Sequence, residues 1–197
     1  LENDPSMYDL GNFVLEQALW DSKLFLQQNP DFFINVNVSA KQLERPDFCR
    51  VVLELLDKTE FPVRHLCLEI TERCRSLPVS VINERMAVLR GYGIKFAMDD
   101  FGTGSSSSAM ALEMLIDEIK IDMSFIRKIL VNKKNKAIVQ SMVDFANAAN
   151  IKSCLEGVEN KALEDYLRTV GATWFQGYYY SKPVGADELE ILLSAKK

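Results

Sequence analysis

The sequence contains a single histidine, His65, and its four cysteines, Cys49, Cys67, Cys74 and Cys154, form no CxxC pair. Zinc metalloproteases with an HExxH motif need two histidines, and structural zinc sites need a quartet of Cys and His ligands, so both classes are excluded. A Ser-His-Asp or Cys-His catalytic site would have to be built on His65 itself. Any metal ion must therefore be held by oxygen ligands, and we expect the thiols to be reduced and mostly buried.

Long apolar runs and an excess of basic residues are also missing. No apolar stretch approaches the ~18 residues of a membrane-spanning helix. The first ten residues have neither the basic nor the apolar region of a signal peptide. With 23 Lys+Arg against 28 Asp+Glu, the net charge is −5, which argues against binding of a nucleic-acid polymer. Because the sequence does not begin with Met, we expect it to be a segment of a longer protein.

The 197 residues are 48% hydrophobic and 26% charged, as in a soluble globular domain. Short apolar runs alternate with longer stretches of helical periodicity. The runs predict strands over residues 32–39, 65–71, 95–100, 118–123, 151–157 and 173–178. The periodic stretches predict helices over residues 9–28, 45–60, 80–93, 109–115, 132–150 and 161–171, with a last helix from Ala186.

Strict alternation of strands and helices predicts a parallel sheet with helices packed outside it. Two architectures fit: a doubly wound open sheet, or a (β/α)8 barrel that lacks some units. A dinucleotide-binding sheet would show GxGxxG after its first strand, where this chain has SAKQLE at 39–44, and Gly102-Thr103-Gly104 lacks the Lys-Ser/Thr of a P-loop. We therefore predict an α/β fold, a (β/α)8 TIM-like barrel truncated at its N-terminus to about six βα units.

Polar side chains stand at or near the carboxyl end of each predicted strand. In a barrel these ends meet on the face where barrel enzymes place their active sites. A single Asp or Asn there is more often the N-cap of the next helix. A series over every strand is hard to explain as caps, since unpaired carboxylates beside apolar strands are costly to bury. The series is Asn37, Glu69 with Glu72, Asp99-Asp100, Lys120 with Asp122, Glu156 with Glu159, and Gln176.

Carboxylates and an amide, without His or Cys, are hard ligands that select Mg²⁺, Mn²⁺ or Ca²⁺. The adjacent Asp99 and Asp100 could place one carboxylate between two ions. Two ions about 3.5–4 Å apart are the usual device for attack of hydroxide on a phosphodiester. Lys120 would then supply a fixed positive charge beside the attacking water or the phosphoryl oxygens.

Six segments of the chain resemble, in order and over nearly its whole length, the successive motifs of the EAL domain. They are NVNVSA (35–40), LEITE (68–72), MDDFGTG (98–104), IKIDMSF (119–125), LEGVE (155–159) and FQGYYYSKP (175–183). That family hydrolyses the bacterial second messenger cyclic di-GMP to linear pGpG. The resemblance therefore implies a phosphodiesterase that uses two Mg²⁺ or Mn²⁺ ions.

The resemblance also implies roles for individual residues. Asn37, Glu69 and Asp99 would bind one ion, while Asp99, Asp100 and Glu156 would surround the second ion and its water. The catalytic residues implied are Lys120, Glu156 and Asp100.

Further residues would bind substrate or regulate the site. Gln176 would line the site, with Asp122 and Tyr178 as additional substrate-binding candidates; helix capping by Asp122 and packing of Tyr178 are equally open. Glu72 resembles the glutamate that anchors the loop after Asp100, and this loop would couple the metal site to a dimer interface. The loop residues implied are Phe101, Gly102, Thr103, Gly104 and Ser105.

The largest departure from the family is the absence of a Glu-Ala-Leu motif before Asn37. We expect residues 1–197 to be a partial EAL domain without the first two barrel strands, and hence weak or inactive on its own. The segments 32–38 and 173–178 would then be unpaired edges that promote strand swapping or oligomerisation.

Three readings of the function stay open. The first is a homodimeric cyclic di-GMP phosphodiesterase of the bacterial cytoplasm. In this reading the parent protein carries upstream sensory or cyclase domains, and it could also carry a membrane anchor. The alternative is a degenerate EAL domain acting as a non-catalytic cyclic di-GMP receptor or protein-interaction module; the acidic ligands present here favour the enzyme. A Schiff base on Lys120 is the third, disfavoured because a lysine beside carboxylates stays protonated.

Overall fold

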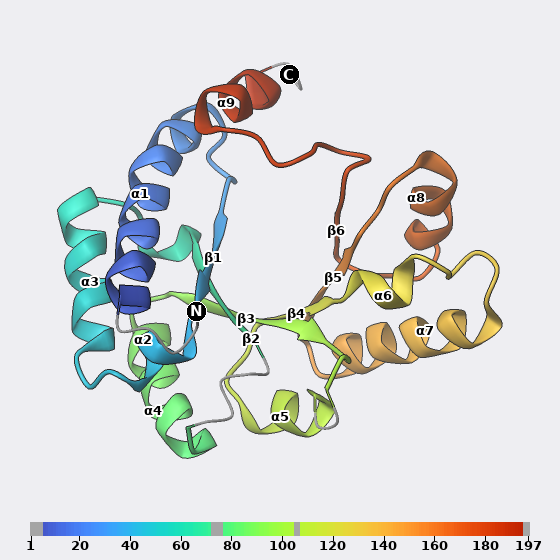
Figure 1. The fold of residues 1–197 in the computed structure, drawn as a ribbon, viewed down its shortest axis with the longest axis horizontal. Coiled ribbons are helices and arrows are strands. Elements are labelled where there is room, and N and C mark those ends of the chain that lie inside the picture. Colours follow the sequence, from blue (N-terminus) through green and yellow to red (C-terminus); the bar gives the residue numbers. More distant parts are fainter. Residues whose placement is uncertain (1–5, 72–76, 105–106, 195–197) are drawn as a thin grey trace. The chain divides into compact units, whose positions relative to one another are not determined.

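A computed structural model describes residues 6–71, 77–104 and 107–194. The chain forms two compact units, each of which is considered separately below (Figure 1). Unit 1 comprises Leu1–Phe96 and Val184–Lys197, and unit 2 comprises Ala97–Pro183. Two predicted regulatory residues, Glu72 and Ser105, lie outside the described residues.

Unit 1 is built on two parallel strands whose register sets Asn37 opposite Glu69. The side chains of Val36 and Val38 are buried on the face opposite to Asn37. Helix α1 contacts α3 and α9, so the last helix packs on the first (Figure 1). The elements are α1 (Ser6–Gln28), β1 (Ile34–Val38), α2 (Ala40–Glu44), α3 (Phe48–Thr59), the 3-10 turn η1 (Val63–His65), β2 (Leu66–Thr71), α4 (Val79–Gly91) and α9 (Ala186–Ser194).

The helix predicted over 45–60 was wrong at its start, and a short helix that was not predicted, α2, precedes it. Ser39 and Gln42 form a capping box that begins α2 directly after β1. Arg45 is extended, with φ −69° and ψ 130°, because the ring of Pro46 disfavours helical backbone at the residue before it. Helix α3 therefore begins only at Phe48.

Unit 2 contains parallel strands in chain order, with β4 between β3 and β5, and β6 beside β5. Helix α7 packs on β4 and β5 and contacts α6 (Figure 1). Strand β3 begins in unit 1 and continues into unit 2. The elements are β3 (Lys95–Phe101), α5 (Ser107–Glu113), β4 (Glu118–Ile121), α6 (Met123–Ile126), α7 (Lys133–Ala148), β5 (Lys152–Glu156), α8 (Lys161–Arg168) and β6 (Trp174–Gln176).

The last strand is shorter than the predicted 173–178. A side chain at Gly177 would collide with the backbone of Val158, so the chain passes this point only as glycine. The Tyr179 N–H then donates to the Val158 carbonyl at 2.9 Å. This close approach turns the backbone away from the sheet after Gln176.

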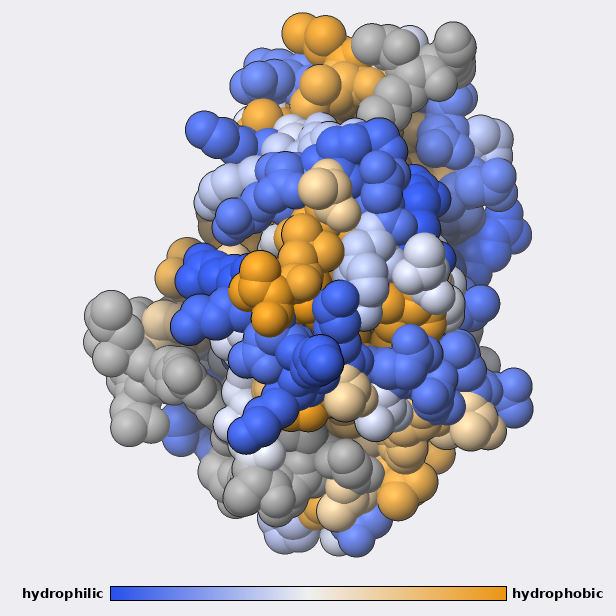
Figure 2. Space-filling model, turned by 90° about the vertical axis from the view of Figure 1, so that its right-hand side faces the viewer, coloured by the Kyte–Doolittle hydropathy of each residue, from blue (hydrophilic) through white to orange (hydrophobic). Residues whose placement is uncertain are grey.

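The surface is mostly hydrophilic on the face drawn in Figure 2, where hydrophobic residues form only small patches. Within the described part of the chain, no helix has the length and apolarity needed to cross a lipid bilayer.

Candidate active site

The centre of the candidate site in unit 2 is a lysine shared by two carboxylates. Lys120 Nζ lies 2.9 Å from Glu156 Oε1 and 3.5 Å from Asp99 Oδ1. The side chain of Lys120 is 7% exposed, whereas those of Asp99 and Glu156 are 18% and 15% exposed. An ion pair this shielded from water is much less screened than a surface pair. Together the three side chains carry one negative charge.

The local sequence explains why these charges meet. Lys120 stands between Ile119 and Ile121, which are completely buried. Alternation along a strand therefore directs Lys120 to the face opposite the apolar core. The neighbouring strands repeat the pattern, with buried Met98 before Asp99 and buried Leu155 before Glu156. Since β4 lies between β3 and β5, its lysine reaches a carboxylate on either side.

Asp100 leaves the strand pattern with a left-handed backbone, φ +55°. Its carbonyl accepts hydrogen bonds from the Thr103 N–H at 3.1 Å and from Thr103 Oγ1 at 2.9 Å. Gly102 follows with φ +96°, and a side chain there would collide with the end of Met142. Phe101 between them is 1% exposed. The start of the predicted loop, through Gly104, is thus a tight turn fixed by backbone conformation.

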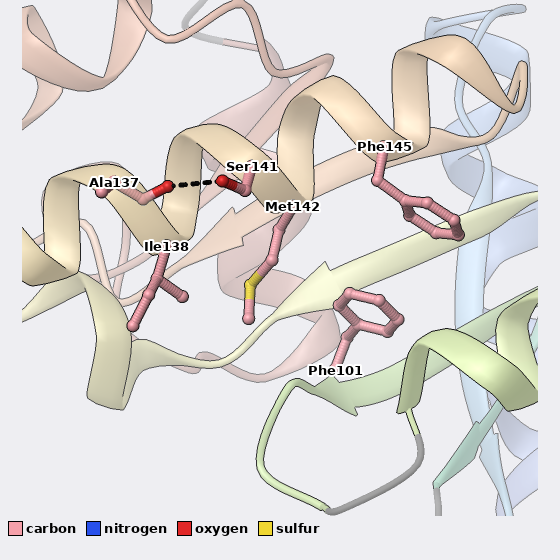
Figure 3. A pocket seen from close by; sticks show the side chains of 6 residues that line it. All are labelled: Phe101, Ala137, Ile138, Ser141, Met142 and Phe145. Carbon is pink, nitrogen blue, oxygen red and sulfur yellow. Dashed lines mark hydrogen bonds between the residues drawn. The ribbon is translucent and has the colours of Figure 1, made fainter.

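The same turn borders an apolar pocket of about 370 Å³ in unit 2 (Figure 3). The rings of Phe101 and Phe145 stack with their centroids 6.2 Å apart. The Ser141 hydroxyl donates to the Ala137 carbonyl at 2.8 Å, which satisfies the one polar side chain of the lining. The lining of the pocket has no charged group that could bind a phosphate. In this it differs from the cluster formed by Asp99, Lys120 and Glu156. It is lined by Phe101, Ala137, Ile138, Ser141, Met142 and Phe145.

Unit 1 carries a second set of polar side chains, on β1 and β2. Asn37 lies opposite Glu69 in the register, and Asn37 is exposed while Glu69 is buried. Asn35 Nδ2 donates to Glu69 Oε1 at 2.8 Å. The sequence analysis missed Asn35, although the two-residue period of Asn35-Val36-Asn37 puts both amides on one face of the strand.

The remaining candidates are more exposed. Gln176 is exposed, and its carbonyl accepts from the Val158 N–H at 3.0 Å. Tyr178 is 61% exposed. Burial raises the pKa of nearby Tyr180. Asp122 Oδ1 accepts from the Ser124 N–H at 2.9 Å and caps α6, so the capping role considered for it is present.

His65 carries no catalytic arrangement. Its Nδ1 lies 2.6 Å from the Phe32 carbonyl oxygen, and the Arg64 Nε–H donates to its Nε2 at 3.0 Å. The first contact joins His65 to a distant segment of unit 1, and the second joins it to the adjacent residue.

The structure thus gathers Asp99, Lys120 and Glu156 in unit 2, and Asn37 with Glu69 in unit 1. Among the described residues, no group of three or more His, Cys, Asp or Glu side chains is arranged to hold a metal ion.

Membership of a known family can be decided by comparison. A family model described as "EAL domain" matches residues 1–183. The chain belongs to the EAL domain family.

One EAL relative is the cyclic di-GMP phosphodiesterase PdeA of Borreliella burgdorferi, 31% identical over 175 residues, which cover 89% of this chain and 26% of that protein. Two solved structures are also similar. The EAL enzyme Bd1971 in its cAMP and cyclic-di-GMP bound form has a TM-score of 0.92 and 32% identity, over 100% of this chain and 54% of that one. The PaMucR phosphodiesterase in complex with c-di-GMP has a TM-score of 0.86 and 30% identity, over 93% and 74% of the two chains.

The structural match confirms the predicted fold class, a fragment of a TIM-like barrel in which parallel strands alternate with helices. It equally confirms the resemblance seen in the motifs. The EAL chain spans about a quarter of the length of the first curated relatives it matches, with shares of 24%, 23% and 26%.

Proposed function

We propose that this EAL chain is the phosphodiesterase part of a protein that hydrolyses cyclic di-GMP to linear pGpG. The observation that carries the proposal is the Lys120 ammonium held between the Glu156 and Asp99 carboxylates at the ends of adjacent strands. Relatives whose names state this activity, and a relative solved with c-di-GMP, support the choice of substrate.

The donor atoms fit divalent cations. Asp99 and Glu156 share one ammonium, so the cluster keeps a net negative charge, and a dication is the counter-ion for such a set. In unit 1, the buried Glu69 carboxylate and the Asn37 amide supply oxygen donors. We propose Asn37, Glu69, Asp99, Asp100 and Glu156 as ligands of two Mg²⁺ or Mn²⁺ ions. When bound, such ions neutralise phosphate charge and make water acidic enough to attack at neutral pH.

Lys120 would act on the charge that develops during the reaction. Its ammonium is fixed by two carboxylates, so its position does not have to reorganise as negative charge grows on the phosphoryl oxygens. Glu156 and Asp99 keep that ammonium protonated, since an adjacent opposite charge favours the charged form. The water oxygen would form the new bond to phosphorus as the bond from phosphorus to one ribose oxygen breaks; a carboxylate such as Asp100 would accept a proton of the water, and the leaving ribose oxygen would take a proton from solvent.

The partners are proposed from the family resemblance. We infer a homodimer in the bacterial cytoplasm, with upstream sensory or cyclase domains, and Gln176, Asp122 and Tyr178 as substrate contacts. The loop from Phe101 to Ser105, with Glu72 as its anchor, would couple the metal site to the dimer interface. Analytical ultracentrifugation of this chain would test the dimer, which a single monomeric species would contradict.

The deciding experiment measures pGpG formation from cyclic di-GMP with Mn²⁺. Three proteins are compared: this chain, a version extended at its N-terminus by the strands that the resemblance implies, and the extended version carrying Lys120→Met. We expect turnover by the extended protein, weak turnover by this chain and none by the variant.

Binding of cyclic di-GMP is measured in parallel, with Ca²⁺ in place of Mn²⁺. Binding without hydrolysis by both unmodified proteins would replace the enzyme by the non-catalytic receptor. Absence of both binding and hydrolysis would overturn the proposal.

A further inference from the structure

One side chain outside the proposed machinery contacts a proposed metal ligand. Asn35 Nδ2 donates to Glu69 Oε1 at 2.8 Å. In the register of β1 and β2, Asn35 lies opposite Cys67 and Asn37 lies opposite Glu69. The hydrogen bond therefore runs diagonally between the strands, and it reaches Glu69 from a position two residues before Asn37 along β1.

The chemistry of the contact fixes which way the amide is turned. A carboxylate accepts hydrogen bonds, so the amide must present its N–H group to Glu69. The side-chain oxygen Oδ1 of Asn35 is buried and has no hydrogen-bond partner among the described residues. An unpaired buried acceptor destabilises a fold, and an apolar side chain at this position would avoid that penalty.

An amide that leaves its own buried oxygen unpaired while it donates to a proposed ligand points to a role in the site. We propose that Asn35 is a positioning residue, which holds the Glu69 carboxylate in the orientation that binds a divalent cation. This inference rests on the proposed function, in which Glu69 is a metal ligand. Hydrogen bonds to ligating side chains set the ligand's orientation and raise metal affinity in many proteins.

The test separates positioning from a structural role. Mn²⁺ affinity is measured by calorimetry, and thermal unfolding is followed in EDTA, for the wild type, Asn35→Ala and Asn35→Leu. We expect about tenfold weaker Mn²⁺ binding in both variants, with little change in the metal-free melting temperature, because losing the hydrogen bond to Glu69 and removing the unpaired oxygen act in opposite directions. The matched control is Val36→Ala on the opposite face of β1, which should lower the melting temperature and leave Mn²⁺ affinity unchanged.

Glu69→Gln and the double variant Asn35→Ala/Glu69→Gln complete the set. If Asn35 acts through Glu69, the double variant binds Mn²⁺ no more weakly than Glu69→Gln alone. A multiplicative loss in the double variant would overturn the inference. So would Asn35 variants that melt earlier in EDTA and bind Mn²⁺ normally.

The same measurements distinguish the two proposals. Wild-type protein that binds no Mn²⁺, or that binds it as well as Glu69→Gln does, would overturn the proposed metal ligands, and the Asn35 inference with them. Weakened binding in Glu69→Gln beside normal binding in both Asn35 variants would overturn the Asn35 inference alone.

Discussion

The two units hold their acidic side chains in different ways. In unit 2, Glu156 and Asp99 are held by a cation, the Lys120 ammonium, at 2.9 and 3.5 Å. In unit 1, Glu69 accepts a hydrogen bond from a neutral amide, that of Asn35, at 2.8 Å. Loss of the partner should therefore have different consequences in the two units, because loss of Lys120 removes the cation between two carboxylates while loss of Asn35 removes one neutral donor from a single carboxylate.

This difference shows how one family can organise carboxylates before a metal ion binds. The lysine fixes both position and charge in unit 2. In unit 1 the amide contributes a hydrogen bond but no charge, and under the proposed function a metal ion would bind Glu69.

The largest effect is expected for Lys120→Met in unit 2. Hydrolysis of cyclic di-GMP should fall about 10³-fold, as when a preorganised transition-state donor is removed. The metal-free protein should lose about 3 kcal/mol of stability, because two partly buried carboxylates then face each other without their cation. Initial rates of pGpG formation and urea unfolding in EDTA provide the two values.

Lys152→Met is the matched control, since Lys152 lies on the neighbouring strand with its Nζ over the Trp174 ring, 6.0 Å from the centroid. This variant should keep its activity. Equal losses in the two variants would show that Lys120 has no special place in the reaction.

Glu69→Gln should have the next largest effect. It should lower the affinity for the metal ion more than the stability of the fold. Replacing the carboxylate by an amide of the same shape should weaken Mn²⁺ binding about 10- to 100-fold. Metal-free stability should change by less than about 1 kcal/mol, because the partner of Glu69 is neutral. Calorimetric titration with Mn²⁺ checks the first value, with exposed Glu54→Gln on α3 as the control. A loss of stability as large as that of Lys120→Met would erase the contrast between the units.

Most of the fold could be predicted from periodicity. Residues 80–93, predicted helical, overlap α4 at all but its first residue, and 118–123, predicted as a strand, contains β4, because buried apolar positions repeat at helical and strand spacing there. The errors came from local rules. Pro46 keeps the expected helix from beginning at Arg45, Ser39 caps a short helix that was not predicted, and Asp122 ends β4 by capping the short helix α6. Such short elements span less than one full repeat of apolar residues and depend on capping residues. They therefore have to be predicted from individual side chains and not from periodicity.

The candidate site, too, could be predicted only in part. Lys120 and Glu156 could be predicted, since each interrupts an apolar strand with a charge. The distance between these two side chains could not be predicted, because it depends on the register between their strands. Asn35 was missed, although it opens the NVNVSA motif, because it stands near the start of its strand and site residues were expected at the carboxyl ends; its importance appears only in the hydrogen bond across to β2.

Gly177→Ala tests the tight backbone of unit 2 with a smaller effect. A methyl group at this position would collide with the Val158 carbonyl and amide nitrogen, which belong to the backbone and cannot rotate away. Stability should fall by about 2–3 kcal/mol, as for other overpacked sites. Urea unfolding provides the value. An unchanged midpoint would mean that the loop after β6 relaxes freely and does not determine where that strand ends.

The smallest effect belongs to Gly91→Ala at the end of α4 in unit 1, where the sign should reverse. A methyl group at Gly91 meets nothing within 4 Å. Alanine favours helix over glycine by up to about 1 kcal/mol, so the melting temperature should rise by about 1–4 °C. Gly93→Ala is the control two residues away: its φ of +102° is unfavourable for a side chain, so this variant should melt earlier. If Gly91→Ala also melted earlier, glycine would be needed at this helix end for a reason other than space, and the contrast with the crowded Gly177 would fail.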